Sequence, residues 1–128
     1  MASFNGITWH AILLEPDKFA AQKSFVIDTY GVSPAMEMDG LTVFNFPDGT
    51  VLELYTQQAA PPWGLNNGVA FGFRVDDVAE ASERLAAAGA ELLGEISRFP
   101  DLNYAWRHFR GVDGRVYGIN ESKPQPTA

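Results

Sequence analysis

The chain has 128 residues, a formal net charge of −7 and no cysteine. The lack of cysteine excludes disulfides, thiol nucleophiles and cysteine-ligated zinc, and it fits a reducing cytoplasm, where we expect the protein to be. The acidic balance and the lack of a basic run argue against partners such as nucleic acid or anionic membrane surfaces. No apolar run approaches the roughly 20 residues that a membrane span needs. We therefore expect one domain over residues 1–128, built as a single body or as two small intertwined modules.

The first half of the chain predicts a strand, a helix and a short strand. Residues 7–14 are apolar and rich in β-formers, which favours a strand buried on at least one face. Asp17 is a candidate cap for a helix that runs to about Tyr30 and ends at Gly31. Residues 35–38 predict a short strand.

A hairpin is predicted over residues 41–56. Two alternating apolar runs flank Pro47, Asp48 and Gly49, where proline presets φ at the turn entry and glycine supplies the positive φ that closes it. Glu53 lies in the second run between two leucines. Burying an unpaired carboxylate is costly, so this residue needs a partner or a ligand.

The second half repeats this order after a connector over residues 57–68, which is rich in proline, glycine and asparagine. Asp77 and Glu80 form a capping box at the start of a helix, and Gly89 is placed to end it. The remaining expected elements are strands over 69–75 and 91–96, a hairpin over 104–109 and 115–121, and a loose tail over 122–128.

The chain thus predicts a β-α-β-β-β order twice, over about 7–56 and 69–121. The two Asp-Gly pairs of the hairpins lie 65 residues apart, which aligns Glu53 with Gly118. In the first parts of the modules an offset near 60 aligns His10 with Ala70. Internal similarity of this kind indicates a duplicated unit. The fold class is α+β with paired modules, as opposed to a doubly wound parallel sheet.

The chain resembles the vicinal-oxygen-chelate superfamily, which includes glyoxalase I, the bleomycin-resistance proteins and the extradiol dioxygenases. Four stretches carry the resemblance: Trp9-His10, and residues 48–54, 73–78 and 112–114. It implies duplicated βαβββ modules that form an open barrel-like cleft, frequent homodimers and, in many members, one divalent metal. The metal ligands come from the first and last strand of each module.

Carried over to this chain, the resemblance places two metal ligands at His10 and Glu53. The other two ligand positions fall on Ala70 and Gly118, whose side chains cannot bind a metal. Half of the ligand set is therefore missing. We expect no cofactor, with one divalent metal as the alternative.

Strand alternation extends the candidate site beyond these positions. A simple register across the first turn puts Phe44 beside Glu53, and in the second hairpin it puts Arg107 and Phe109 on the face of Gly118. The same alternation points His108 towards the helix. Trp63 in the connector is a candidate for stacking on a ligand. The predicted ligand-binding residues are His10, Phe44, Glu53, Tyr55, Trp63, Arg107, Phe109 and Asn120.

Three functions remain open at this point. The leading hypothesis is a metal-free protein that binds a small, cationic or aromatic molecule, similar to the drug-sequestering members of the superfamily. The alternative is a metal-dependent lyase, isomerase or dioxygenase that uses His10 and Glu53, which could also act as a proton-transfer pair without metal. The third is a duplicated domain whose role is contact with another protein.

Overall fold

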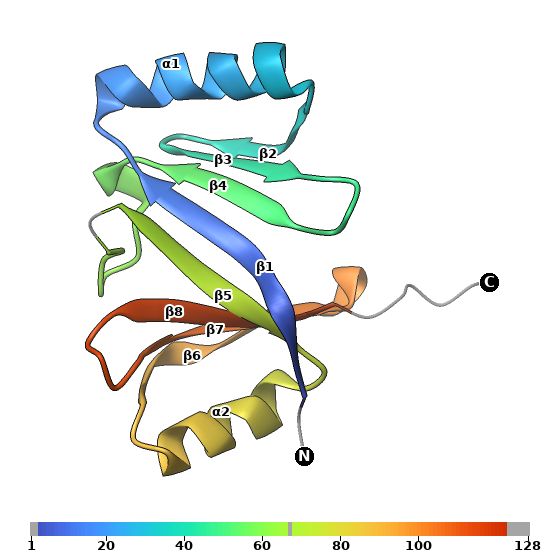
Figure 1. Ribbon diagram of the computed structural model, residues 1–128, viewed down its shortest axis with the longest axis vertical. Coiled ribbons are helices and arrows are strands. Elements are labelled where there is room, and N and C mark those ends of the chain that lie inside the picture. The colour runs from blue at the N-terminus through green and yellow to red at the C-terminus, as the bar shows by residue number, and fades with distance from the viewer. Residues whose placement is uncertain (1–2, 67, 123–128) are drawn as a thin grey trace, which may run out of the picture. The chain divides into compact units, whose positions relative to one another are not determined.

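The computed structural model describes residues 3–66 and 68–122 and contains the predicted β-α-β-β-β order twice (Figure 1). In the first copy α1 continues into a π-helical turn, η1, and the last strand is followed by a 3-10 turn, η2. The first copy comprises β1 (Phe4–Leu13), α1 (Pro16–Phe25), η1 (Val26–Tyr30), β2 (Pro34–Met38), β3 (Leu41–Asn45), β4 (Val51–Tyr55) and η2 (Gln57–Ala59). The second comprises β5 (Val69–Val75), α2 (Val78–Ala87), β6 (Glu91–Phe99), the 3-10 turn η3 (Pro100–Leu102), β7 (Tyr104–Arg110) and β8 (Val116–Ser122).

Contacts along the chain define two compact units. The N-terminal unit holds residues 8–70, and the C-terminal unit holds the described residues 3–7 and 71–122. The start of β1 joins the C-terminal unit because Phe4 makes an edge-on ring contact with Phe73 and the Ser3 amide donates to Asp76. Beyond Ser122, the predicted tail lies outside the described residues. Within the described chain, no helix is long and apolar enough to cross a membrane.

The N-terminal unit is a sheet with the strand order β2-β3-β4-β1, in which β1 runs parallel to β4. One face packs on α1 and η1 around three fully buried side chains, Val26, Phe44 and Leu54. The opposite face carries Trp9 and Ala11, which pack against partly buried neighbours from β4. The two faces therefore have different partners, and the direction of each side chain decides whether it serves the core.

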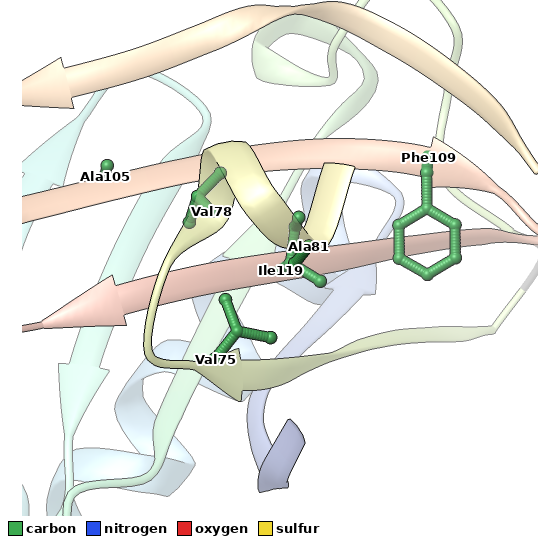
Figure 2. Packing of buried hydrophobic residues seen from close by; sticks show 6 residues of the cluster. All are labelled: Val75, Val78, Ala81, Ala105, Phe109 and Ile119. Atoms are coloured by element: carbon green, nitrogen blue, oxygen red, sulfur yellow. The ribbon is translucent and has the colours of Figure 1, made fainter. Parts of the chain in front are cut away.

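The C-terminal unit repeats this arrangement with the order β5-β8-β7-β6 and β5 parallel to β8. Its helix packs on one face of the sheet, and Figure 2 shows Phe109 and Ile119 on the side of α2. The predicted capping box is present, because the Glu80 amide donates to the Asp77 carboxylate at 3.0 Å. Glu121 adds a second acceptor at this helix start, where the Val78 amide donates to it at 2.7 Å.

Both hairpins turn through matching loops, residues 46–50 and 111–115. Gly49 and Gly114 have φ values of 88° and 85°, which confirms their predicted role in the turns. The pairing that follows differs from the simple register by one residue. Phe44 lies opposite Leu52, and Phe109 lies opposite Tyr117. Since side chains alternate along a strand, this single step reverses the expected face of both phenylalanines.

Candidate functional site

Glu53 is the centre of the most distinctive polar cluster in the N-terminal unit. It lies in the middle of β4, between Ala11 of β1 and Val43 of β3. Its carboxylate accepts a hydrogen bond from the Tyr55 hydroxyl at 2.8 Å and another from the side chain of Trp9. Burial raises the pKa of Glu53 above its usual value and outweighs these two hydrogen bonds, which lower it. The hydrogen-bond donors, Trp9 and Tyr55, are uncharged. They therefore do not neutralise the negative charge of Glu53 when it ionises.

Two aromatic side chains frame this carboxylate. Trp9 is 7% exposed and packs with Ala11 and Ala70, and the partly buried Tyr55 contacts the same group. The same two rings donate the hydrogen bonds to the acid. We call Trp9, Glu53 and Tyr55 the Glu53 cluster. Its chemistry is that of a carboxylate flanked by aromatic rings, a combination that suits organic cations.

His10 lies on the opposite face of the same sheet. Its Cα pairs with Leu52, which packs in the core under α1, and its Nδ1 lies 3.2 Å from the Val51 carbonyl oxygen. The expectation that His10 and Glu53 share a face is therefore wrong. In this arrangement they form neither a pair of metal ligands nor a proton-transfer pair.

The pairing of the first and last strands of each module shows which residue occupies the ligand position that the sequence alignment assigned to His10. Glu53 lies opposite Ala11, and Gly118, its counterpart, lies opposite Gly72. Two residues earlier on the same faces are Trp9 in the first module and Ala70 in the second. The offset is therefore 61 residues here, not 60, and Trp9 occupies the position that the alignment gave to His10.

The residues present do not fit a divalent metal of the kind that the resemblance implies. Glu53 supplies one carboxylate, whereas Trp9, Ala70 and Gly118 have no side-chain group that binds Mg²⁺, Mn²⁺ or Zn²⁺. Within residues 3–66 and 68–122, no three His, Cys, Asp or Glu side chains are gathered as a metal site requires. Trp9 and Tyr55 donate hydrogen bonds to Glu53 through N–H and O–H groups. In this arrangement they do not act as further ligands of a metal ion bound by the carboxylate.

Three of the other candidates have structural partners. Phe44 is fully buried under α1, and Phe109 packs in the core under α2. Arg107 pairs with Ile119, so the expectation that it shares a face with Gly118 is wrong, and it donates from Nε to the carbonyl of Gly94, where the β6–β7 register shifts. Trp63 is half-buried in the connector. Within the N-terminal unit, the structure brings together two of the predicted ligand residues, Glu53 and Tyr55.

The face of the C-terminal unit away from α2 carries a second polar group. Asn120 pairs with Trp106, and His108 pairs with Gly118, so all four share one face. His108 thus points away from the helix, contrary to expectation. Burial lowers its pKa from 6.5 to about 4, and the ring is neutral at pH 7. Its ring lies 4.6 Å from that of Trp106.

Trp9 and His108 are the residues that sequence reasoning missed. The repeat could have revealed Trp9, because an offset of 61 instead of 60 aligns it with Ala70. No pattern in residues 11–14 chooses between these offsets, since all four are apolar. The length of the hairpin loop sets the pairing of β7 with β8, and this pairing decides to which face of the sheet His108 points.

Comparisons with known proteins show the fold. Neither a protein-family model nor a curated protein sequence matches the chain. Among solved structures, the Mn(II)-bound glyoxalase from Novosphingobium aromaticivorans has a TM-score of 0.71 and 16% identity, over 100% of this chain and 44% of that one. Methylmalonyl-CoA epimerase from Mycobacterium tuberculosis has a TM-score of 0.67 and 16% identity, over 94% and 90% of the two chains.

A third similar structure is described as a glyoxalase/bleomycin resistance protein/dioxygenase superfamily member from Vibrio splendidus 12B01. It has a TM-score of 0.60 and 19% identity, over 94% of this chain and 100% of that one. At these identities the similarity concerns the fold, and it agrees with the resemblance seen in the sequence.

Proposed function

Since the chain has the glyoxalase/bleomycin-resistance/dioxygenase fold, we propose that it binds a small organic cation at the Glu53 cluster without a metal. The observation that carries this proposal is the state of Glu53: a partly buried carboxylate with a raised pKa, held by Trp9 and Tyr55. A binding protein uses such a group as the counter-charge of its ligand. The role is the capture of a cationic or aromatic compound, not its conversion.

Electrostatics favour a cation at this place. An ionised carboxylate in a poorly hydrated site is destabilised until an opposite charge comes within a few ångströms. The electron-rich faces of Trp9 and Tyr55 also attract an alkylammonium group. The net charge of −7 raises the local concentration of cations around the protein. Each of these effects distinguishes a cation from a neutral molecule of the same shape.

The enzyme alternative has less support. A metal-dependent lyase, isomerase or dioxygenase needs several ligands around one ion, and Glu53 has neutral aromatic donors where a second ligand would stand. The manganese of the similar glyoxalase belongs to that protein, and its presence there shows only what the fold permits. We therefore place the metal-free binder first.

The test compares a cation with its uncharged isostere. Phenyltrimethylammonium and tert-butylbenzene have the same shape, and their binding is followed by calorimetry and by quenching of tryptophan fluorescence. We expect the cation to bind at least about tenfold more tightly, as one charge–charge or cation–π contact of about 1.4 kcal/mol would give. Glu53→Gln should abolish the preference, because the amide keeps the shape and the acceptor oxygen but not the charge.

The matched control is Asp28→Asn, which removes one exposed carboxylate of the same unit and changes the net charge equally. It should keep the preference for the cation. Equal affinities for the two probes, or an equal effect of both variants, would reject Glu53 as the counter-charge.

A further inference from the structure

The face of the C-terminal unit away from α2 carries an arginine, Arg74 of β5. Its Cα pairs with that of Asn120 in β8, and Asn120 pairs with Trp106 in β7. Phe73 and Ile119, which directly precede Arg74 and Asn120, pack under α2. Since side chains alternate along a strand, the row of Arg74, Asn120 and Trp106 lies on the opposite face. The three strands are neighbours in the sheet and can be followed in Figure 1.

Arg74 has no counter-charge on this face at the positions whose pairing the structure describes. Its own row continues to Ser97 of β6, and the adjacent row consists of Gly72, Gly118, His108 and Leu93. None of these is an acid, and His108 is neutral at pH 7. Across residues 3–66 and 68–122, the Arg74 guanidinium forms no hydrogen bond and no ion pair. A guanidinium is always charged, so an acidic protein presents an unmatched positive charge here.

The nitrogens of Arg74 divide into one that is covered and two that are not. Its Nε is buried and has no hydrogen-bond partner, whereas the two Nη nitrogens at the end of the side chain are not buried. Buried nitrogens are normally paired, so no bond within the described chain explains why an arginine stands here. Nε is covered and cannot reach a ligand. The two Nη groups can, and adjacent N–H groups match the two oxygens of a carboxylate.

Trp106 supplies an aromatic surface at the other end of the row. It is partly exposed, and its ring lies 4.6 Å from the ring of the buried His108. Two strand spacings separate its Cα from that of Arg74, which is roughly 10 Å. Asn120 lies between them and has a short, uncharged side chain. The row therefore offers a cation and an aromatic surface at a separation that one small molecule can span.

We propose that Arg74 and Trp106 bind a small organic carboxylate with an aromatic body. The carboxylate accepts hydrogen bonds from both Nη groups of Arg74, and the body packs against the ring of Trp106. A phosphate monoester fits less well, because it carries a charge of about −1.5 to −2 and the row has one cation. This site shares no residue with the Glu53 cluster and takes the opposite charge, so it goes beyond the proposed cation site.

The first experiment titrates the uniformly ¹⁵N-labelled protein with 3-phenylpropanoate and three analogues, followed by the backbone amide and indole resonances. 3-Phenylpropanamide keeps the shape without the charge, propanoate keeps the charge without the ring, and phenyl phosphate carries a ring with a higher charge. We expect 3-phenylpropanoate to bind at least about tenfold more tightly than each analogue, with saturable shifts at Arg74, Trp106 and Asn120. An analogue of equal affinity, or the absence of saturable shifts at these residues, overturns the inference.

The second experiment separates recognition by the guanidinium from attraction by any positive charge. Arg74→Lys keeps the charge but loses the planar pair of N–H groups, and Arg74→Met loses both. We expect 3-phenylpropanoate binding to weaken at least about tenfold in Arg74→Met and by a smaller factor in Arg74→Lys. The thermal midpoint of ligand-free Arg74→Met should equal or exceed that of the native protein, because a buried, unpaired nitrogen is gone. Unchanged affinity, or a lower midpoint, contradicts the assignment.

The matched control is Arg98→Met, which removes an exposed arginine of the same unit and changes the net charge equally. Arg98 pairs with Ala105, which packs under α2, so it belongs to the other face of the sheet. Its variant should bind 3-phenylpropanoate as the native protein does. An equal loss of affinity in Arg98→Met and Arg74→Met would show that net charge and not the row of Arg74 attracts the carboxylate.

Discussion

At the scale of single residues, the environment of Glu53 governs how the protein responds to pH. Its carboxylate loses hydration on folding and receives two hydrogen bonds from neutral donors. The balance raises its pKa, so the folded protein keeps this proton at pH values where the unfolded chain has released it. Glu53 therefore opposes folding at neutral pH, and a cationic ligand would relieve this effect.

We predict that Glu53→Gln stabilises the ligand-free protein at neutral pH. Because the folded state binds more protons than the unfolded state between the ordinary and the raised pKa, the free energy of unfolding falls as pH rises through that window. The glutamine has no such dependence and still accepts the hydrogen bonds of Trp9 and Tyr55. Urea unfolding from pH 4 to 8 should show the variant gaining on the native protein as pH rises. Parallel curves would contradict the assigned pKa shift.

His108 changes the pH dependence of stability in the opposite direction from Glu53. Burial lowers its pKa to about 4, so between pH 6.5 and 4 the unfolded chain binds more protons than the folded protein. The free energy of unfolding therefore decreases as the pH is lowered through this range. The full effect corresponds to about 3 kcal/mol. His108→Gln should remove this loss of stability in acid. The measurement is the difference in unfolding free energy between the native protein and the variant, compared at low pH and at pH 8. An equally steep loss in the variant would exclude His108 as its source.

Residue types alone were enough to single out Glu53 but not its partners. A carboxylate between two leucines is an exception in any apolar strand, and the sequence marks it clearly. The sequence does not fix the face of Trp9, because the apolar residues 11–14 that follow it fit either offset of the repeat. His10 looked like a metal ligand because histidine is a common one and its position lay one residue from the correct place.

At the scale of elements, the order and type of strands and helices were predictable. The sheet face to which the side chains of β1, β3 and β7 point was not. Proline, glycine and capping residues mark the ends of elements, and they fixed both hairpins and α2. The faces depend on register, where a step of one residue reverses every side chain. Phe44 and Phe109 were misplaced for the same reason, since both hairpins have the same loop length.

Close approach of β5 and β8 gives a prediction at this scale. A Cβ on Gly72 would lie 2.5 Å from the carbonyl oxygen of Gly118, which is backbone and cannot move aside. Gly72→Ala should therefore destabilise the protein by about 2 kcal/mol, as overpacking typically does.

Gly111→Ala is the matched control for this change. Its Cβ would meet a ring carbon of Tyr117 at 2.9 Å, and the ring of a side chain can shift. Urea unfolding should show a clearly smaller loss for Gly111→Ala than for Gly72→Ala. An equal or larger loss at Gly111 would mean that the strand contact is not what limits position 72.

At the scale of the whole molecule, the duplication was the most reliable signal in the sequence. Two Asp-Gly hairpins at a fixed spacing, each preceded by a strand and a helix, predicted the fold that the solved structures share. Ligand capacity could be judged only in part, because it depends on which side chain of each strand faces the site. The number of chains in the assembly stays a prediction, and light scattering would test the expected homodimer.

Metal content is the prediction that concerns the entire chain. After dialysis against Mn²⁺, Fe²⁺, Zn²⁺ or Ni²⁺ and removal of free ions, we expect far less than one metal per chain, because the described part of the chain gathers no three His, Cys, Asp or Glu side chains at one place. Elemental analysis of the native protein and of Glu53→Gln measures this directly. About one metal per native chain, lost in the variant, would return the enzyme hypothesis to first place.

The central claim is that Glu53 is the counter-charge of a bound cation, and a carboxyl titration tests it most directly. The Glu53 side-chain carboxyl is followed by ¹³C resonance against pH, assigned by its loss in Glu53→Gln, with and without saturating phenyltrimethylammonium. We predict a pKa above the usual glutamate range in the free protein and a clear fall on binding, because the cation favours the ionised form. A pKa that the bound cation leaves unchanged would contradict the account.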